Sequence, residues 1–224
     1  LKAEDEDVFK SSSEIIVDQG ATLDLNNYKQ TAHDLQGAGS VNLGTAQLTV
    51  INDNSTAFSG LISGAGSLFK SGSETLTLSG ASTYSNGTTI NSGRLIAANA
   101  SALGTGLVTN NTVLELAASG TMVNQLTGSG SVEKTGAGTI NLTGTGSSVG
   151  NFNVLGGSVH FAHNGGFTAG SYTTAGNAVT SLGSAAALEV TGIFTQAANT
   201  GLAVIARPAG SPIITADEAN LGGS

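Results

Sequence analysis

The sequence predicts an all-β solenoid, most simply a parallel β-helix, from three observations. Short runs of alternating apolar and polar residues recur along the chain, glycine-rich corners separate them, and longer phrases repeat. Glycine supplies 33 of the 224 residues, whereas an average chain of this length has roughly 16. The apolar share is 39%, with only 4% aromatic residues. Such a composition favours many thin layers over one thick globular core.

Period-two alternation with β-branched residues, bounded by turn-forming residues, indicates strands. In such strands Leu76 and Leu78 are expected to face inward, and Thr75 and Thr77 outward. Helical periodicity is almost absent, and only residues 215–220 are expected to hold a helical turn. The clearest strand runs are residues 15–17, 21–25, 47–50, 75–78, 113–116 and 139–142.

Two phrases, residues 61–80 and 125–144, align without gaps and share four glycines and the lysine pair Lys70 and Lys134. A repeat of roughly 20 to 30 residues built from short strands has the size of one solenoid coil, which buries its inner face only by stacking on its neighbours. With neighbouring strands about 4.8 Å apart, residues 15–161 predict about six or seven coils and a rod roughly 30 Å long. An antiparallel sandwich, which also has short strands and glycine turns, is the alternative.

The pattern predicts three parts along the chain. Residues 1–14 form an acidic leading segment that comes from a preceding coil, and residues 15–164 form the β-helix stalk. After His163 the repeat breaks, and both prolines follow it. Because an open β-helix end exposes unpaired backbone and an apolar cross-section, residues 165–224 are predicted to form a C-terminal β-rich cap.

Charge and cysteine content restrict the possible partners and cofactors. The net charge of −8, from 7 basic and 15 acidic residues, argues against nucleic acid, whose phosphates need clustered Lys and Arg. With no cysteine, disulfides and Cys-ligated metals are excluded. No run approaches the length of a membrane-spanning helix. The acidic N-terminus is unlike a signal peptide, so we expect the chain to be a piece of a longer protein.

Residues 64–72, 75–80 and 82–93 strongly resemble the autotransporter-associated β-strand repeat, and residues 125–144 repeat its first half. That repeat belongs to passenger domains of bacterial type V autotransporters, of the self-associating adhesin and pertactin-like kind. Residues 188–224 are similar to the C-terminal folding segment of such passengers, the autochaperone region. The resemblance implies a right-handed parallel β-helix displayed at the cell surface or outer membrane of a Gram-negative bacterium, or released from it. It also implies a C-terminal translocator barrel as the partner during secretion.

Several motifs were weighed as chemical sites. Residues 146–150 match the G-x-S-x-G nucleophile elbow, but the helix which that motif requires does not follow. His160 and His163, three apart on a strand, should face opposite sides and share no metal. His33 beside Asp34 is expected in a surface turn. The acidic residues are mostly scattered singly, so no carboxylate pair for acid–base catalysis is evident.

Two repeated features have structural interpretations. Lys70 and Lys134 are expected to play the same structural role near a corner, in preference to forming a ligand site. Rows of threonine suggest ice binding, which needs uniform coils, and these coils vary too much in length.

The sequence therefore predicts a non-enzymatic stalk of an adhesin or virulence factor, with no catalytic residue, cofactor or metal. The interaction site suggested is the polar corner Asn52, Asp53 and Asn54, which would serve self-association or binding of a host or cell-surface receptor. Weak polar contacts along two rods can add up to useful avidity. The alternatives are a scaffold for an upstream effector such as a protease, and a β-helix glycan-active enzyme.

Overall fold

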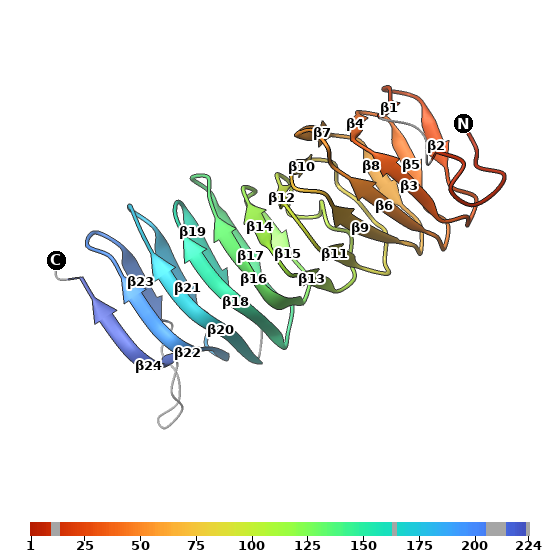
Figure 1. Cartoon of the computed structure of the whole chain (residues 1–224). Helices are drawn as coiled ribbons and strands as arrows, with labels where there is room; N and C mark the ends of the chain where they lie inside the picture. Colours follow the sequence, from red (N-terminus) through yellow and green to blue (C-terminus); the bar gives the residue numbers. More distant parts are fainter. Residues whose placement is uncertain (10–13, 163–164, 205–213, 223–224) are drawn as a thin grey trace.

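Figure 1 shows an elongated rod of stacked coils with the two chain termini at opposite ends. The structure is a computed structural model that describes residues 1–9, 14–162, 165–204 and 214–222. The described part contains strands and no helix, and strands of successive coils pair in parallel through about nine turns. These findings confirm the predicted all-β parallel solenoid, and the parallel pairing rules out the antiparallel sandwich.

Each coil runs through three faces in turn, and most coils contribute a strand to each face; the coils of β10 and β12 have no strand on the second. The first face contains β1 (Ile15–Val17), β4 (Leu35–Gly37), β7 (Thr56–Phe58), β10 (Thr75–Leu78), β12 (Arg94–Ala97) and β14 (Val113–Leu116). The second contains β2 (Thr22–Asp24), β5 (Ser40–Asn42), β8 (Leu61–Ser63), β15 (Gly120–Met122), β17 (Thr139–Leu142), β19 (Ser158–Phe161), β21 (Val179–Leu182) and β23 (Gly201–Val204). The third contains β3 (Gln30–His33), β6 (Gln47–Ile51), β9 (Ser67–Ser71), β11 (Thr88–Ile90) and β13 (Val108–Asn110).

From the sixth coil onward, single long strands run from the third face into the first. They are β16 (Leu126–Lys134), β18 (Ser147–Val154), β20 (Gly165–Thr174), β22 (Ala186–Gln196) and β24 (Ile214–Leu221). The first part of β16 pairs with β13 and its second part with β14. Gly128 lies at the bend with φ +109°, a conformation that residues with a Cβ rarely adopt. A Cβ there would also collide with the backbone oxygen of Asn110 in the preceding coil.

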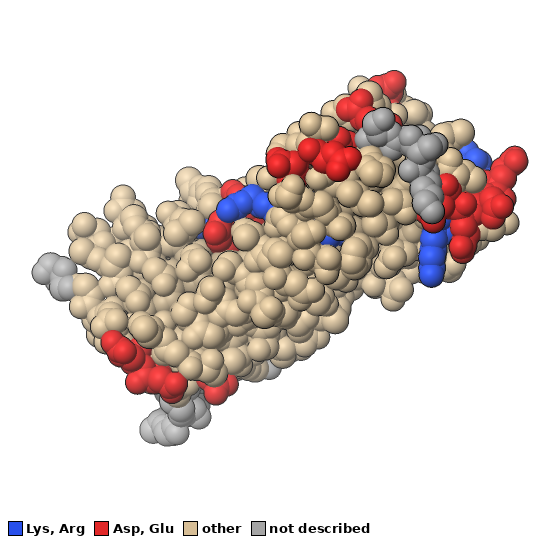
Figure 2. All heavy atoms as spheres, viewed as in Figure 1, with Lys and Arg blue, Asp and Glu red and all other residues tan. Residues whose placement is uncertain are grey.

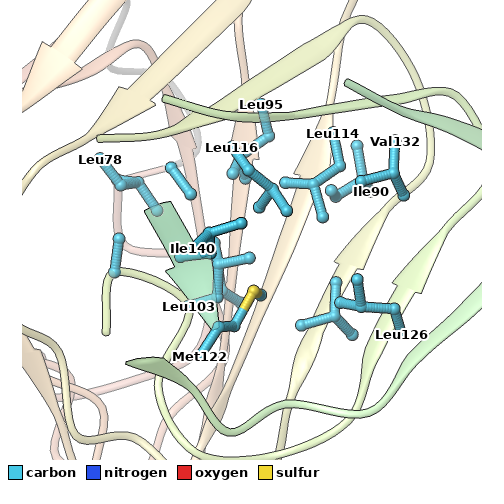
Figure 3. Close-up of a cluster of buried hydrophobic side chains, with 14 of the residues drawn as sticks. Leu78, Ile90, Leu95, Leu103, Leu114, Leu116, Met122, Leu126, Val132 and Ile140 are labelled. Atoms are coloured by element: carbon cyan, nitrogen blue, oxygen red, sulfur yellow. The ribbon is translucent and has the colours of Figure 1, made fainter. Parts of the chain in front are cut away.

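The core is a set of inward columns, each built from one residue per coil. On the first face Leu76, Leu95, Leu114 and Val132 are successive register partners, and all four are buried. Figure 3 shows several of them packed against buried residues from the other faces, among them Met122 and Ile140. The inward position of Leu76 and Leu78 confirms the prediction from alternation.

The same column becomes aromatic towards the C-terminal end. Val132 is followed in register by Phe152, Tyr172 and Phe194. The ring of Tyr172 stacks on both neighbours, with centroids 5.5 Å from Phe152 and 5.5 Å from Phe194. Phe161 and Phe167 pack against the edges of this stack. The later coils therefore contain a contiguous cluster of buried aromatic rings.

The two matching sequence phrases occupy different faces. Lys70 is the next-to-last residue of β9 on the third face, and the chain then turns into β10 on the first. Lys134 ends β16 on the first face, and the chain then turns into β17 on the second. The repeated unit is therefore strand, corner and strand, used at two different corners of the rod. One coil takes roughly 20 residues, the short end of the expected range.

Some expectations need correction or extension. Residues 215–220 form part of β24 rather than a helical turn, because they pair in parallel with β22. The solenoid has about nine turns in all, since residues 165–204 and 214–221 continue the same ladders beyond residues 15–161, the part for which six or seven turns were expected. Both prolines and His163 lie outside the described residues. The division at residues 14 and 164 stays a prediction.

The leading segment pairs with the first complete coil. Lys2 bridges Asp24 in parallel, and the amide of Ala3, a buried residue, donates to the carbonyl of Asp24 at 2.8 Å. Farther along, the amide of Asp7 donates to the carbonyl of Lys29 at 2.9 Å. Residues 1–9 therefore lie over the end of the stack, as the strand of a preceding coil would.

Candidate functional site

The predicted polar corner lies between β6 and β7, where the third face turns into the first. Asn52 is buried, and its side-chain amide donates to the hydroxyl of Thr56 at 2.8 Å and to the carbonyl of Asn54 at 3.3 Å. Asp53 and Asn54 are exposed. Of the three predicted residues, Asn52 therefore holds the turn together, while the other two present polar groups to solvent.

A buried carboxylate from the preceding coil orients this corner. Asp34 lies between β3 and β4 in the left-handed region, with φ +45°, and is 4% exposed. Its Oδ1 accepts from the backbone amides of Asp53 and Asn54, both at 3.0 Å, and its Oδ2 accepts from Asn54 Nδ2 at 2.7 Å. Burial alone would raise the pKa of Asp34, but these hydrogen bonds, helped by His33, hold it below the usual value.

His33 adds the surface part of the corner. Its Nδ1 lies 2.7 Å from Asp53 Oδ2, and the Asp53 side chain is 60% exposed. His33 was expected in a surface turn; its imidazole is partly exposed, but the residue ends strand β3, and Asp34 after it is buried under the corner. His33, Asp34, Asp53 and Asn54 together form an accessible polar patch with a fixed backbone. Its use in binding stays a prediction.

The structure also joins charges on the first face that the sequence showed as scattered. Arg94 Nη1 lies 2.8 Å from Glu115 Oε2 and 2.8 Å from Glu133 Oε2. Glu115 and Glu133 are register partners on β14 and β16, and Thr135 donates to the other oxygen of Glu115 at 2.7 Å. Because one guanidinium holds both carboxylates, this cluster ties three successive coils together.

The two repeated lysines are buried at corners, as predicted. Lys70 Nζ donates to the carbonyls of Ser71 at 2.6 Å, Gly72 at 3.1 Å and Ser92 at 3.3 Å. Lys134 Nζ donates to the carbonyls of Thr135 and Gly136. Burial lowers the pKa of Lys70 to about 8, against an opposing effect of Glu74, and burial also lowers the pKa of Lys134.

The remaining sequence candidates have ordinary surroundings. His160 Nδ1 lies 2.8 Å from Ser181 Oγ, its partner in the next coil. Ser148, the serine of the G-x-S-x-G match, lies within strand β18 on the third face. Within the described residues, no group of three or more His, Asp or Glu side chains is placed to hold a metal ion. No helix there is long and apolar enough to cross a membrane.

Sequence reasoning missed Asp34 as the organiser of the corner, and it missed the Arg94 cluster. Both depend on contacts to residues one or two coils away along the chain. The usable signal was the spacing itself, because polar residues separated by one coil length stack on the same corner or strand.

Comparison with known proteins agrees with this geometry. The family model described as passenger-associated-transport-repeat matches residues 68–97 and 132–160, which cover β9 to β12 and most of β16 to β19. The "Adhesin BmaC autotransporter" of Brucella suis biovar 1 (strain 1330) is 43% identical over 83 residues. The match covers 34% of this chain, and the chain spans about 2% of the length of that relative. No solved structure matches the chain significantly.

Both matched segments begin at a buried residue, Leu68 or Val132, two positions before the buried corner lysine Lys70 or Lys134. Each segment contains the strand, corner and strand unit around its lysine and continues into the following strands. In its two passenger repeats, its 83-residue similarity to an autotransporter adhesin and its parallel solenoid, the chain is similar to autotransporter passenger domains.

Proposed function

We propose that the chain forms part of the β-helical stalk of a surface-displayed adhesin from a Gram-negative bacterium. The observation that carries this proposal is the position of the two passenger repeats, which fall on consecutive strands of a parallel solenoid. The name of the adhesin relative supports adhesion over catalysis. The translocator barrel of the same polypeptide would be its partner during secretion.

The polar corner supports an adhesive role in chemical terms. His33, Asp53 and Asn54 present hydrogen-bonding groups on a backbone fixed by buried Asp34. A preorganised polar surface loses little conformational entropy when it binds. The paired acids Glu115 and Glu133 are both held by Arg94, so neither resembles a free general acid or base.

Surface display tests the adhesive role. The chain would be fused to a translocator barrel, expressed in a non-adherent Gram-negative host, and compared with an unrelated β-helix of similar length. We expect increased attachment to host cells or increased aggregation of the bacteria. Asp53→Ala with Asn54→Ala should reduce it if the corner is the contact. Display at equal density without any gain in attachment would contradict the adhesin and favour a scaffold for an upstream effector.

We also propose that the C-terminal part caps the stack and starts its folding. The stacked rings of Phe152, Tyr172 and Phe194 support this role, because they concentrate buried area in the last coils. Deleting residues 187–224 should leave a protease-sensitive and poorly displayed passenger. Deleting residues 1–34 removes about as much chain from the other end and serves as the control. Unchanged display and protease resistance after the C-terminal deletion would remove the folding role.

A further inference from the structure

One outward column of the third face consists almost entirely of threonine. Its members are register partners from coil to coil, so each lies next to the following one on the neighbouring strand. At about 4.8 Å per strand the column runs for about 43 Å. We call it the threonine column: Thr31, Thr49, Phe69, Thr89, Thr109, Thr127, Ser148, Thr168, Glu189 and Thr215.

Strand propensity alone does not explain this column. Threonine suits exposed strand positions in general, so propensity would enrich it on all three faces. The matching column of the first face has three threonines among nine residues: Ala57, Thr77, Ile96, Glu115, Glu133, Asn153, Thr173, Thr195 and Asn220. The column of the second face runs through Thr121, Asn141, His160, Ser181 and Ala203. Threonine is therefore more frequent in the column of the third face, at seven of ten positions, than in the columns of the other two faces.

The column contains a four-coil stretch with unused polar groups and an aromatic ring. Phe69 lies between Thr49 and Thr89, and Thr109 follows. All four side chains are partly exposed. Within the described residues, the hydroxyls of Thr49, Thr89 and Thr109 form no hydrogen bond with another protein group. Each hydroxyl can both donate and accept, and the ring adds an apolar surface.

The charge distribution limits what can bind here. From Thr31 to Thr168 the column holds no charged side chain, although the chain has a net charge of −8. Figure 2 shows broad tan areas without acidic or basic side chains on this side of the rod, whereas the charged side chains gather towards its ends and in a group midway along it. An acidic ligand would need Lys or Arg, as phosphate recognition does. The absence of charge from the column favours a neutral partner.

We propose that the threonine column binds a neutral, extended polysaccharide that lies along the rod. Sugar hydroxyls both donate and accept, as threonine hydroxyls do, and the apolar face of a sugar ring fits against Phe69. An extended β-linked glycan advances per sugar by a distance similar to one strand spacing, so successive coils can contact successive sugars. Each contact is weak, and their repetition along one chain supplies the affinity.

Two other occupants fit the column less well. A protein partner is expected to meet an interface core enriched in aromatic residues, Met and Arg, and Phe69 is the only such residue in the column. Ice binding needs an uninterrupted regular array, and Phe69 and Glu189 interrupt the hydroxyls. The inference deepens the proposed adhesive function, on which it rests, by naming a ligand class and a surface.

The test measures binding of the purified chain to cellohexaose and chitohexaose by calorimetry, with oligogalacturonate as the acidic comparison. Thr49→Val, Thr89→Val and Thr109→Val combined remove three hydroxyls and keep β-branched shape. We expect saturable binding to a neutral oligosaccharide that weakens at least about tenfold in this variant, because several hydrogen bonds are lost. Phe69→Ala should weaken binding as well, and Phe69→Tyr should retain it.

The first face supplies the matched control: Thr77→Val, Thr173→Val and Thr195→Val combined remove three outward hydroxyls there. That variant should bind the oligosaccharide within about twofold of the wild type, because its substitutions lie on another face. It should also stay folded, since single outward hydroxyls add little to stability. Circular dichroism confirms that each variant is folded.

Four results would overturn the proposal: no binding of the wild-type chain to either neutral oligosaccharide, equal binding of oligogalacturonate, equal losses in both triple variants, or self-association that only the third-face variant abolishes. Bacterial attachment without oligosaccharide binding would overturn this inference and leave the adhesive function standing. Oligosaccharide binding without any attachment of bacteria that display the chain would leave this inference standing and contradict the adhesive function.

Discussion

Lys70 shows how a single buried amine can stabilise a corner by hydrogen bonds to several backbone carbonyls. Its stem lies in the inward column between Val50 and Ile90, its register partners. Its Nζ reaches backbone carbonyls of two successive coils. Lys134 repeats the arrangement at another corner with Thr135 and Gly136. The lysine thus satisfies carbonyl groups that a corner would otherwise leave buried without a donor.

The lowered pKa of Lys70 predicts a pH dependence of stability. Its pKa of about 8 in the fold lies below the value of about 10.4 in an unfolded chain. Between these values the unfolded state binds more protons, so the free energy of unfolding should rise with pH. Urea unfolding from about pH 8 to about pH 9.5, below the ordinary tyrosine pKa of about 10, measures this rise.

Lys70→Met and Lys134→Met together should flatten the rise, because they remove the titrating amines and keep the unbranched stems. Lys29→Met, at an exposed position, is the control and should leave the slope unchanged. A wild-type protein whose stability is constant across that interval would contradict the prediction.

Asp34 also has a lowered pKa in the fold, because hydrogen bonds from Asn54 and Asp53 outweigh the effect of its burial, so its contribution to stability likewise rises with pH, but in the acidic range. An acid with a lowered pKa stabilises the fold above its unfolded pKa of about 3.9 and loses that contribution as the pH falls through its folded value. Asp34→Asn should therefore destabilise the protein at neutral pH by about 1–3 kcal/mol, because it sets an amide against donors that need an acceptor.

The difference between Asp34→Asn and wild type should shrink below about pH 4, as the wild-type carboxyl becomes protonated. Chemical unfolding at neutral and acidic pH measures it. Asp18→Asn, at an exposed turn, is the comparison. Equal stability of Asp34→Asn and wild type at neutral pH would mean that the corner does not depend on this carboxylate.

At the scale of strands, Arg94 is the clearest link between elements. It starts β12 and holds acids of β14 and β16, two strands that are themselves neighbours. Without the guanidinium, Glu115 and Glu133 would repel each other across one strand spacing, and like charges directly opposite destabilise a sheet.

Arg94→Gln should lower the free energy of unfolding by about 1 kcal/mol, a value typical of partly exposed ion pairs with good geometry. Adding Glu133→Gln to Arg94→Gln should recover part of the loss, since it removes one of the repelling charges. Thermal unfolding at low and high salt measures both variants. A double variant less stable than Arg94→Gln alone would show that repulsion is not the cause.

The strands themselves were predictable from sequence because alternation requires no knowledge of the partner. The inward position of Leu76 followed from period two and holds in the structure. Residues 215–220 were misjudged because their composition favours a helix, and pairing with β22 overrides that preference. The corner at Asn52 was visible as a turn. The role of Asp34 was not visible in the sequence, because it depends on which corner of the next coil stacks on Asp34.

At the scale of the whole rod, the coil count shows the limit of repeat analysis. The matching phrases around Lys70 and Lys134 suggested equivalent coils, but they lie on different faces. Because the rod has three similar corners, the same strand, corner and strand unit can occur at a different corner in another coil. Sequence similarity therefore identified the unit correctly, while the number of turns required the register of the strands.

Stability should be uneven along the rod, since each coil contacts only its neighbours and stability adds up layer by layer. The aromatic stack predicts slower amide hydrogen exchange in residues 152–194 than in residues 35–58. Tyr172→Ala should cost about 3–5 kcal/mol, as for large aromatic truncations in a packed core. It should also speed exchange locally in β18, β20 and β22.

Leu48→Ala, at a fully buried position in β6, should instead speed exchange around β3, β6 and β9. Mass-spectrometric exchange with peptide resolution separates the two patterns. Uniform acceleration along the whole chain after either change would mean that the coils unfold as one unit.

The parallel pairing has a mechanical consequence for a molecule tethered at both ends. Backbone hydrogen bonds point along the long axis, and the termini lie at opposite ends (Figure 1). A tensile load therefore peels an end layer one bond after another instead of shearing a whole ladder at once. Each detached layer releases a short length of slack, so a stretched tether would yield in steps and absorb work before it breaks.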